Sequence, residues 1–420
     1  MYLRWLMFFL AFGWVTATDS CSYKGLIEHL GLDSDNFQMK SLRPVYNFSN
    51  PTGVLVDLFV TSITDVNEKA QSFATQITLV LGWINEFTRW NDSNFCGLQT
   101  CTIDKDKMWI PDITIAESIK AEFAAVENPY VKMFNFGGVL LSETLILTTA
   151  CKMDLYKFPF DVQTCELTVQ SSLNSIDELT VNPFSDASFM TASSKKSFQT
   201  QGEWELLSIT VSKSNMSTLG YVLDQLKFQI TIKRRPLLYI INFISPVFCF
   251  LVLDVASFFM NSAEGEKLGF KVTLLLAISV LLLILNDTLP STANEVPLIG
   301  LFCSVIFILI GISILESILV DFLMARGDQI EDSTSTVTDT AKDSNSLPDP
   351  ETDQSEERLS TLDCLKQILT EFRNAAKPKG GARTTGCWHR AAMIINVIFI
   401  VVYILSIIVF LIVVSKAWFT

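Results

Sequence analysis

The sequence predicts an extracellular β-sandwich followed by a four-helix transmembrane bundle. Two observations predict this fold class. Between Thr18 and Arg235, short apolar stretches of alternating polarity lie between turn residues. From Leu237 onward, four apolar segments are each long enough to cross the ~30 Å hydrocarbon core of a bilayer. The mean hydropathy of +0.37 agrees with a membrane protein, and a net charge of −13 without a basic block disfavours nucleic acid as a partner.

The first seventeen residues have the pattern of a secretory signal peptide. Arg4 supplies the positive start, residues 6–15 form the apolar part, and Val15-Thr16-Ala17 resembles a cleavage site. An apolar run of about ten residues is short for a membrane anchor, which needs ~20. We therefore predict residues 1–17 to be a signal peptide and residues 18–236 to be exported.

The exported part consists mainly of predicted strands. Residues 23–32 alone have a helical pattern of some length. The segments that alternate in polarity are 54–60, 76–83, 138–149, 166–170, 203–212 and 226–232. Strands of this length, separated by turn residues, are typical of a β-sandwich.

The four predicted membrane spans are residues 237–260, 267–285, 296–323 and 391–414. Residues 237–325 hold the first three, and residues 415–420 are a short C-terminal tail. Arg326 follows the third span, and Lys377, Lys379, Arg383 and Arg390 precede the fourth. Because basic residues favour the cytoplasmic side, the loop 326–390 is predicted to be cytoplasmic and both termini extracellular.

The predicted cytoplasmic loop has two parts. Residues 327–356 are rich in Ser, Thr, Asp and Pro, which predicts disorder. Residues 357–376 carry Leu359, Leu362, Leu365, Leu369 and Phe372 at helical spacing. Two arrangements of this predicted amphipathic helix remain open. In one it lies on the membrane surface by itself, and in the other it continues into the fourth span and lines the cytoplasmic exit of the pore.

The second span has the pattern of a pore-lining helix. One helical face combines an acid at each end, small or hydroxylated residues near the inner end and apolar residues between them: Glu266, Gly269, Thr273, Leu276, Val280, Ile284 and Asp287. Rings of Glu266 and Asp287 from several subunits would attract cations. A ring of Leu276 would close the pore by dewetting.

Two alternatives to a cation pore remain. Lys267 and Lys271 could indicate an anion pore, but neither lies on the predicted face. The span could also be an ordinary packing helix, although the acids at matching positions disfavour this.

Cysteines and sequons of the exported part predict covalent modification. Cys96 and Cys101 are separated by four residues and could close a small loop, while pairing of either with Cys21 stays open. The predicted glycosylation sites are Asn47, Asn91 and Asn215.

Several motifs together resemble one family. Cys151 and Cys165 enclose thirteen residues that contain Phe158-Pro159-Phe160-Asp161. The other motifs are Trp109-Ile-Pro-Asp112, Arg234-Arg235-Pro236, Gly265-Glu266-Lys267 and Asp287-Thr-Leu289-Pro290. In these motifs the chain resembles the Cys-loop pentameric ligand-gated ion channels. Within them it resembles the serotonin type-3 receptor group, with the zinc-activated channel a close second.

The resemblance implies a pentamer that binds its agonist between extracellular domains. It also implies a disulfide between Cys151 and Cys165. Binding would be relayed to the pore through Phe158, Pro159, Phe160, Asp161, Arg234, Arg235, Leu289 and Pro290.

The agonist site implied by the resemblance has lost aromatic residues. Amine-gated members hold a cation among aromatic rings, whereas this chain has Ser172 and Thr78 at two positions of that box and Val80 in place of an arginine. The ligand-binding candidates are Glu117, Ser172, Tyr221, Thr78 and Val80. A zinc site is the other candidate. Because the exported part has one histidine, His29, we assign no metal ligands.

The predicted function is a subunit of a cation-selective channel in the plasma membrane, synaptic in location, that conducts sodium and potassium, with calcium as a further candidate. Its predicted partners are other subunits, membrane lipid and an agonist, either a serotonin-like amine or zinc. Gating by zinc or protons and a non-conducting accessory subunit are the alternatives. We find no enzyme motif and expect no cofactor.

Overall fold

The computed structural model describes residues 22–33, 37–124, 127–199, 202–218, 220–260, 264–288, 296–338 and 385–419. The predicted signal peptide, the amphipathic segment 357–376 and the relay residues Leu289 and Pro290 lie outside these ranges. The described residues form two compact units. The first contains residues up to 155 and residues 160–236, and the second contains residues 156–159 and the segments from 237 onward.

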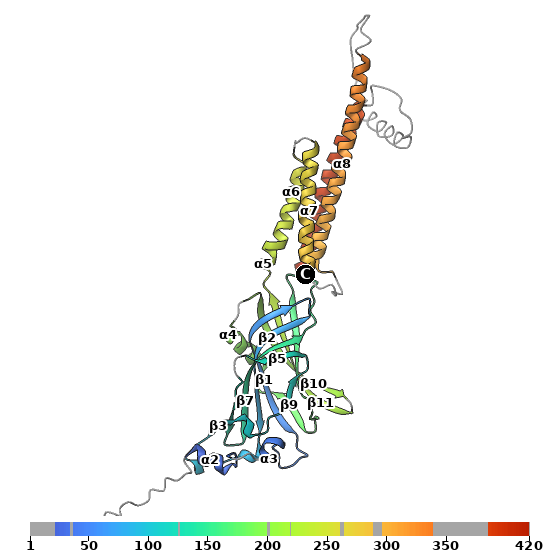
Figure 1. Cartoon of the computed structure of the whole chain (residues 1–420). Helices are drawn as coiled ribbons and strands as arrows, with labels where there is room; N and C mark the ends of the chain where they lie inside the picture. The colour runs from blue at the N-terminus through green and yellow to red at the C-terminus, as the bar shows by residue number, and fades with distance from the viewer. Residues whose placement is uncertain are drawn as a thin grey trace, which may run out of the picture. The chain divides into compact units, whose positions relative to one another are not determined.

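Two β-sheets build the first unit (Figure 1). The larger sheet has seven strands in the order β3-β6-β7-β2-β1-β9, with β5 paired to β7. All of its described pairs are antiparallel except β1 with β9, which is parallel. Its strands are β1 (Thr52–Asn67), β2 (Ser72–Ile84), β3 (Thr100–Asp104), β5 (Ser118–Phe123), β6 (Tyr130–Phe134), β7 (Gly138–Ala150) and β9 (Leu179–Pro183).

The smaller sheet has four antiparallel strands in the order β10-β11-β8-β4. Its strands are β4 (Ile113–Ile115), β8 (Val162–Ser171), β10 (Trp204–Thr218) and β11 (Tyr221–Arg234). Short helices complete the unit: α2 (Tyr23–His29), α3 (Phe37–Ser41), α4 (Ala187–Ser197) and the 3-10 turns η2 (Glu86–Thr88), η3 (Asp92–Phe95) and η4 (Lys105–Lys107).

Alternating side chains of both sheets form one hydrophobic core. Strand β2 is the clearest case, because every second residue from Phe73 to Trp83 is buried. Val56, Leu167 and Phe228 are also fully buried in this core. The two sheets therefore make the sandwich that the alternating pattern predicts.

Each of the predicted strand segments overlaps an observed strand, and the predicted helical segment 23–32 overlaps α2, which ends at His29. The short strands β3, β4, β6 and β9 and the short helix α3 were not predicted, and neither were β5 and α4. Strand β5 is exposed at all six positions, so it has no alternation to detect. Helix α4 buries only Met190 and Ser194, which leaves almost no apolar period in the sequence.

The second unit contains four helices that are long and apolar enough to cross a membrane, by length and composition: Leu237–Ser257, Glu266–Asp287, Leu298–Arg326 and Arg390–Phe419. The first is built from α5 (Leu237–Tyr239), a π-helical turn η5 (Ile240–Ile244) and α6 (Ser245–Ser257). Pro246 stands in the first turn of α6, where its missing N–H is tolerated. The other helices are α7 (Glu264–Thr288), α8 (Leu298–Thr338) and α10 (Thr385–Phe419).

Two of these helices extend beyond the predicted segments. Helix α8 continues to Thr338, into the segment 327–356 that was predicted to be disordered. No proline occurs there before Pro348, and adding residues to an existing helix is easier than starting one. Helix α10 extends from Thr385 to Phe419, so most of the predicted tail 415–420 is helical.

Candidate functional site

The predicted pore face of α7 is exposed along its whole length. All seven predicted pore residues are exposed, with Leu276 at 64% and Val280 at 50%. The opposite side of α7 is buried against the other helices through Lys271, Leu274, Ile278 and Leu285. In the single chain, the face with an acid at each end is therefore the face left free for water or for other subunits.

A buried polar network fixes the rotation of α7 by joining all four long helices. Lys271 of α7 donates to the carbonyl and the hydroxyl of Ser313 on α8, at 3.1 and 2.6 Å. The Ser313 hydroxyl donates to Asp254 of α6 at 2.9 Å, and the Tyr403 hydroxyl of α10 donates to the other Asp254 oxygen at 2.5 Å. Because these groups are buried, losing one partner would leave a charge or dipole unpaired.

Neither lysine of α7 lies on the exposed face. Lys271 is fully buried, and its ammonium lies 3.8 Å from the centre of the Phe258 ring. Lys267 lies 5.5 Å from the centre of that ring. The charges on the exposed face of α7 are thus the acids Glu266 and Asp287.

In the first unit, Arg234 is the centre of a buried charged cluster. Its Nε donates to Asp161 at 2.8 Å, and its Nη2 lies 2.7 Å from Glu68. The guanidinium also stacks on the Trp204 ring, 4.2 Å from the ring centre. Gln163 donates to the second Asp161 oxygen at 2.6 Å. The turn after β1, the residue before β8 and the strands β10 and β11 therefore meet at one guanidinium.

Burial acts against the charge of Arg234, but its partners outweigh that effect. Desolvation lowers the pKa of Arg234, while hydrogen bonds and attraction from Asp161 and Glu68 raise it, and the pKa ends above its usual value. Arg234 therefore keeps its charge at neutral pH in spite of its burial. The two predicted relay residues Asp161 and Arg234 form a direct ion pair.

The predicted relay is divided between the two units. Phe158 and Pro159 belong to the second unit, where the Phe158 ring packs edge-on against Tyr239 and the Phe158 carbonyl accepts from Trp418 Nε1 at 3.3 Å. Phe160, Asp161, Arg234 and Arg235 belong to the first unit. The segment around Phe158 thus joins the two units along the chain.

The ligand-binding candidates lie on both sheets. Thr78 and Val80 lie on β2 of the larger sheet, and Thr78 helps to line a cavity of about 550 Å³ together with Phe59, Phe189 and Lys196. The other candidates belong to the region of the smaller sheet. Ser172 directly follows β8 and is exposed, and Tyr221 starts β11 with 45% of its surface exposed. One chain therefore does not gather these residues into one site.

Glu117 has a structural role in this chain. Its carboxylate accepts from the backbone N–H of Thr168 at 2.7 Å, which ties the β4–β5 turn to β8. Asp112 organises the neighbouring loop in the same way, since it accepts from the Ser171 hydroxyl and from the N–H of Leu173. A carboxylate used in this way is a weaker candidate for binding an ammonium ion or a metal.

Comparison with known proteins identifies the family. The family model described as "Neurotransmitter-gated ion-channel ligand binding domain" matches residues 27–236. A second model, "Neurotransmitter-gated ion-channel transmembrane region", matches residues 243–345. The chain belongs to the neurotransmitter-gated ion-channel family.

Three relatives in this family illustrate the range of similarity. The 5-hydroxytryptamine receptor 3A of Cavia porcellus is 37% identical over 292 residues, which are 69% of this chain and 59% of that receptor. The human 5-hydroxytryptamine receptor 3E is 32% identical over 74% of this chain and 68% of the relative. The neuronal acetylcholine receptor subunit beta-3 of Rattus norvegicus is 29% identical over 74% of this chain and 67% of the relative. The chain thus spans less than two thirds of the length of the 3A receptor that it matches.

The disulfide expected from the family signature is confirmed, because Cys151 and Cys165 are bonded. The predicted bond between Cys96 and Cys101 is wrong. Cys101 is a free, buried thiol on β3, whereas Cys96 is disulfide-bonded to another partner. Side chains of β3 alternate between the two faces of the sheet, and this alternation points the Cys101 side chain into the core of the sandwich, away from the surface loop of Cys96. Cys21, the open alternative, lies outside the described residues.

The three sequons of this family member lie on its surface. Asn47, Asn91 and Asn215 are exposed. Asn47 and Asn91 each accept a hydrogen bond from the N–H of the serine two residues later, Ser49 and Ser93. Asn215 lies on β10, an edge strand of the smaller sheet.

The sequence reasoning missed two features of this family member. On α7, Val272 and Leu283 are exposed beside the predicted face. Because their side chains are apolar, the sequence does not indicate whether they face the pore or the lipid. Glu68 and Trp204 complete the Arg234 cluster. Among the described residues no group of three or more His, Cys, Asp or Glu side chains could hold a metal ion.

Proposed function

We propose that this chain is a subunit of a cation-selective ligand-gated channel in the plasma membrane, assembled as a pentamer with the exposed face of α7 toward the shared axis. The observation that carries the proposal is the distribution of charge on α7. Glu266 and Asp287 are exposed at the two ends of that face, while Lys271 is buried in the helix network. Rings of acids at a narrow pore favour cations.

The proposal includes the arrangement across the membrane and the kind of agonist. Both termini are extracellular, the loop after α8 is cytoplasmic, and the agonist binds between adjacent first units. The printed names of the relatives, 5-hydroxytryptamine and acetylcholine receptors, support an amine agonist. Lack of a metal cluster among the described residues gives zinc no support. We place the channel at synapses on the same analogy with the relatives.

A second candidate function is a non-conducting accessory subunit. Ser172 and Thr78 take the place of aromatic rings that bind an ammonium ion, and a missing cation–π contact weakens binding by ~1–2 kcal/mol. Such a subunit would assemble with a partner that supplies the binding residues.

Recording from oocytes that express the chain tests both candidates. We expect cation currents under a panel of serotonin, acetylcholine, zinc and proton steps. No current in spite of normal surface delivery would favour the accessory role. In currents that do appear, Glu266→Gln should reduce the negative shift of the reversal potential when external NaCl is diluted. Glu205→Gln, an exposed site on β10, is the matched control. An unchanged shift in Glu266→Gln would contradict the acid ring.

A further inference from the structure

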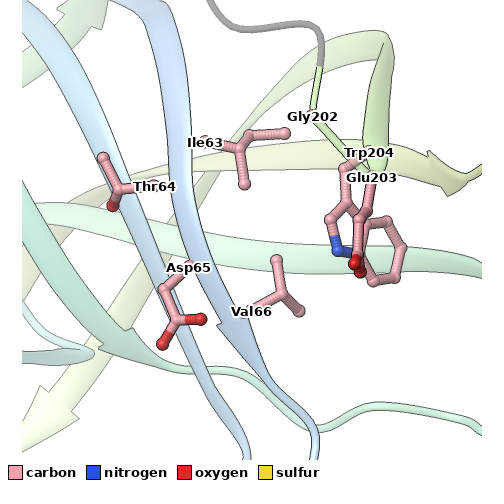
Figure 2. A pocket seen from close by; sticks show the side chains of 7 residues that line it. All are labelled: Ile63, Thr64, Asp65, Val66, Gly202, Glu203 and Trp204. Carbon is pink, nitrogen blue, oxygen red and sulfur yellow. The ribbon is translucent and has the colours of Figure 1, made fainter.

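Two buried oxygen atoms of the second unit lack a hydrogen-bond donor within the described part of the chain. They are Oε1 of Glu316 on α8 and Oδ1 of Asn396 on α10. Glu316 is only 6% exposed. By contrast, none of the described side chains that line the cavity of about 230 Å³ beside the start of β10 has such an atom (Figure 2). The buried acceptors that the described chain leaves unused therefore lie in the helix bundle.

The second oxygen of Glu316 has one weak donor. The Ser317 hydroxyl lies 3.5 Å from it, but this hydroxyl has a single hydrogen and lies closer to the Ser313 carbonyl, at 3.1 Å. The Lys271 ammonium is directed at Ser313 and at the Phe258 ring instead. An ionised Glu316 would therefore be a buried carboxylate without a good hydrogen bond, which is very costly in a membrane span.

Among the described residues, the charges around Glu316 balance when Glu316 itself is uncharged. Lys267 and Lys271 of α7 and Asp321 of α8 are the charged groups that act on it. Asp254 of α6 interacts with the same two lysines. Two lysines then face two aspartates, and an ionised Glu316 would add a negative charge without a partner.

Helices α8 and α10 run antiparallel. Val320 of α8 packs in one cluster with Ala392 of α10, whereas Phe302 of α8 stacks on Phe410 of α10 with ring centres 6.1 Å apart. A step toward the N-terminus of α8 therefore matches a step toward the C-terminus of α10.

Glu316 and Asn396 lie at the same level of this helix pair. Each is four residues, about one helical turn, from the contact between Val320 and Ala392, in the same direction along the bundle. Because residues four apart share a helix face, Glu316 and Asn396 belong to the faces that pack together. On the same face of α10, two turns further, Tyr403 enters the polar network of the four helices.

We infer that Glu316 is a carboxylic acid that keeps its proton at neutral pH and donates it to Oδ1 of Asn396. One hydrogen atom then accounts for both oxygen atoms, since Oε1 becomes the donor and Oδ1 its acceptor. The bond fastens α10 to α8. Release of the proton breaks the bond and leaves a charge in the span, so the pair is a pH-sensitive lock on α10. An effect of this lock on currents rests on the proposed channel function, whereas the proton itself does not.

The protonated acid makes stability depend on pH in a defined direction. A glutamate of the unfolded chain ionises at about pH 4.3, so unfolding at neutral pH releases the Glu316 proton. Stability therefore falls as pH rises, up to the pH at which the folded chain also releases the proton. Glu316→Gln has no proton to release, and its amide can still donate to Asn396.

Thermal unfolding of the purified full chain in detergent, from mildly acid to neutral pH, tests the inference without any current. We expect the melting temperature of wild type to fall relative to that of Glu316→Gln by about 1–2 °C per pH unit. Glu205→Gln, an exposed site on β10, is the matched control and should follow wild type. A difference between wild type and Glu316→Gln that is the same at every pH would overturn the proposal.

Infrared spectroscopy of the same samples detects the proton directly and does not require that Glu316→Gln folds. Wild type at neutral pH should show the C=O stretching band of a protonated carboxylic acid, and Glu316→Gln should lack it. Asn396→Leu, which retains Glu316, should shift this band to higher frequency because the acid loses its acceptor. No such band in wild type, the same band in Glu316→Gln, or an unshifted band in Asn396→Leu would contradict the shared proton.

Discussion

Leu276 is the residue at which the proposed pore can be tested most directly. It is 64% exposed near the middle of the α7 face, between Thr273 and Val280. An apolar ring at this depth would exclude water from a narrow pore without any moving plug.

Leu276→Thr should therefore ease opening, because a hydroxyl hydrates the constriction. We expect half-maximal activation at about tenfold lower agonist concentration, measured from concentration–response currents. Leu405→Thr, on an exposed face of α10, is the matched control. Unchanged sensitivity in Leu276→Thr would contradict a leucine gate.

Asp161 is the second decisive residue, because it neutralises a guanidinium that is fully buried. It is 2% exposed and accepts from Arg234 and Gln163. Removing one partner of a buried pair leaves the other charge without compensation.

Asp161→Asn should destabilise the first unit by about 3–5 kcal/mol. The measurement is thermal unfolding of the purified full chain, with Asp186→Asn as the control. Asp186 precedes α4, and its side chain makes no capping hydrogen bond there. A melting temperature equal to wild type would show that Glu68 alone can compensate Arg234.

At the scale of elements, the polar network decides how the four helices pack. Apolar faces alone allow many helix rotations, since lipid is as apolar as the side chains. Buried groups that require partners select one rotation. Asp254, Lys271, Ser313 and Tyr403 come from four different helices and meet at one place.

Tyr403→Phe should loosen α10 from this network, because Asp254 loses a donor while the ring is retained. We expect a loss of about 1–2 kcal/mol in thermal stability in detergent. Ser415→Ala is the control, because Ser415 is exposed and bonds only within its own helix. Equal stability of Tyr403→Phe and wild type would mean that the other hydrogen bonds suffice.

Lys105 joins separate elements of the larger sheet. It lies beside Glu127 and donates to Glu143 of β7 at 2.9 Å. Burial lowers the pKa of Lys105, but hydrogen bonds and attraction from Glu143 and Glu127 outweigh this and raise the pKa above 10.5.

A raised folded-state pKa means that the folded chain holds the Lys105 proton more tightly than the unfolded chain. Its contribution to stability is therefore complete at neutral pH and is lost as pH rises through the raised pKa. Lys105→Met should melt lower than wild type at pH 7, with the gap narrowing at strongly alkaline pH. A gap that does not change with pH would assign Lys105 a packing role only.

At the scale of the whole molecule, the exposed apolar surface of the second unit can contact either lipid or other subunits. Val401 of α10 and Leu276 of α7 are similarly exposed, at 63% and 64%. Exposure in a single chain does not distinguish these two residues. In an oligomer around a shared axis, only the residue that faces the axis would lie close to the same residue of the other subunits.

Leu276→Cys in the full chain should form disulfide-linked dimers between subunits upon mild oxidation, detected on non-reducing gels. Val401→Cys should not form them, because α10 would face lipid. The unsubstituted chain controls for its own free cysteines, which among the described residues are Cys101, Cys249 and Cys303. Cross-linking through Val401 and none through Leu276 would place α7 against lipid and end the pore proposal.

Elements whose signal is periodic and local could be predicted from the amino-acid sequence alone. Alternation in β2 indicates which face of the strand is buried. The lengths of the four apolar segments indicate how long the membrane-spanning helices are. The α7 face was also visible, because Glu266 and Asp287 lie at matching helical positions.

The contacts between residues that are distant in the sequence became visible only in the folded chain. The partners of Arg234 come from the turn after β1, the residue before β8 and the start of β10. The network of Lys271 spans four helices. The folded chain also shows that Cys101 is free, although its spacing from Cys96 allowed a bond. Local pattern reports the environment of a side chain, whereas pairing depends on strand order and helix rotation, which are set by the packing of the whole chain.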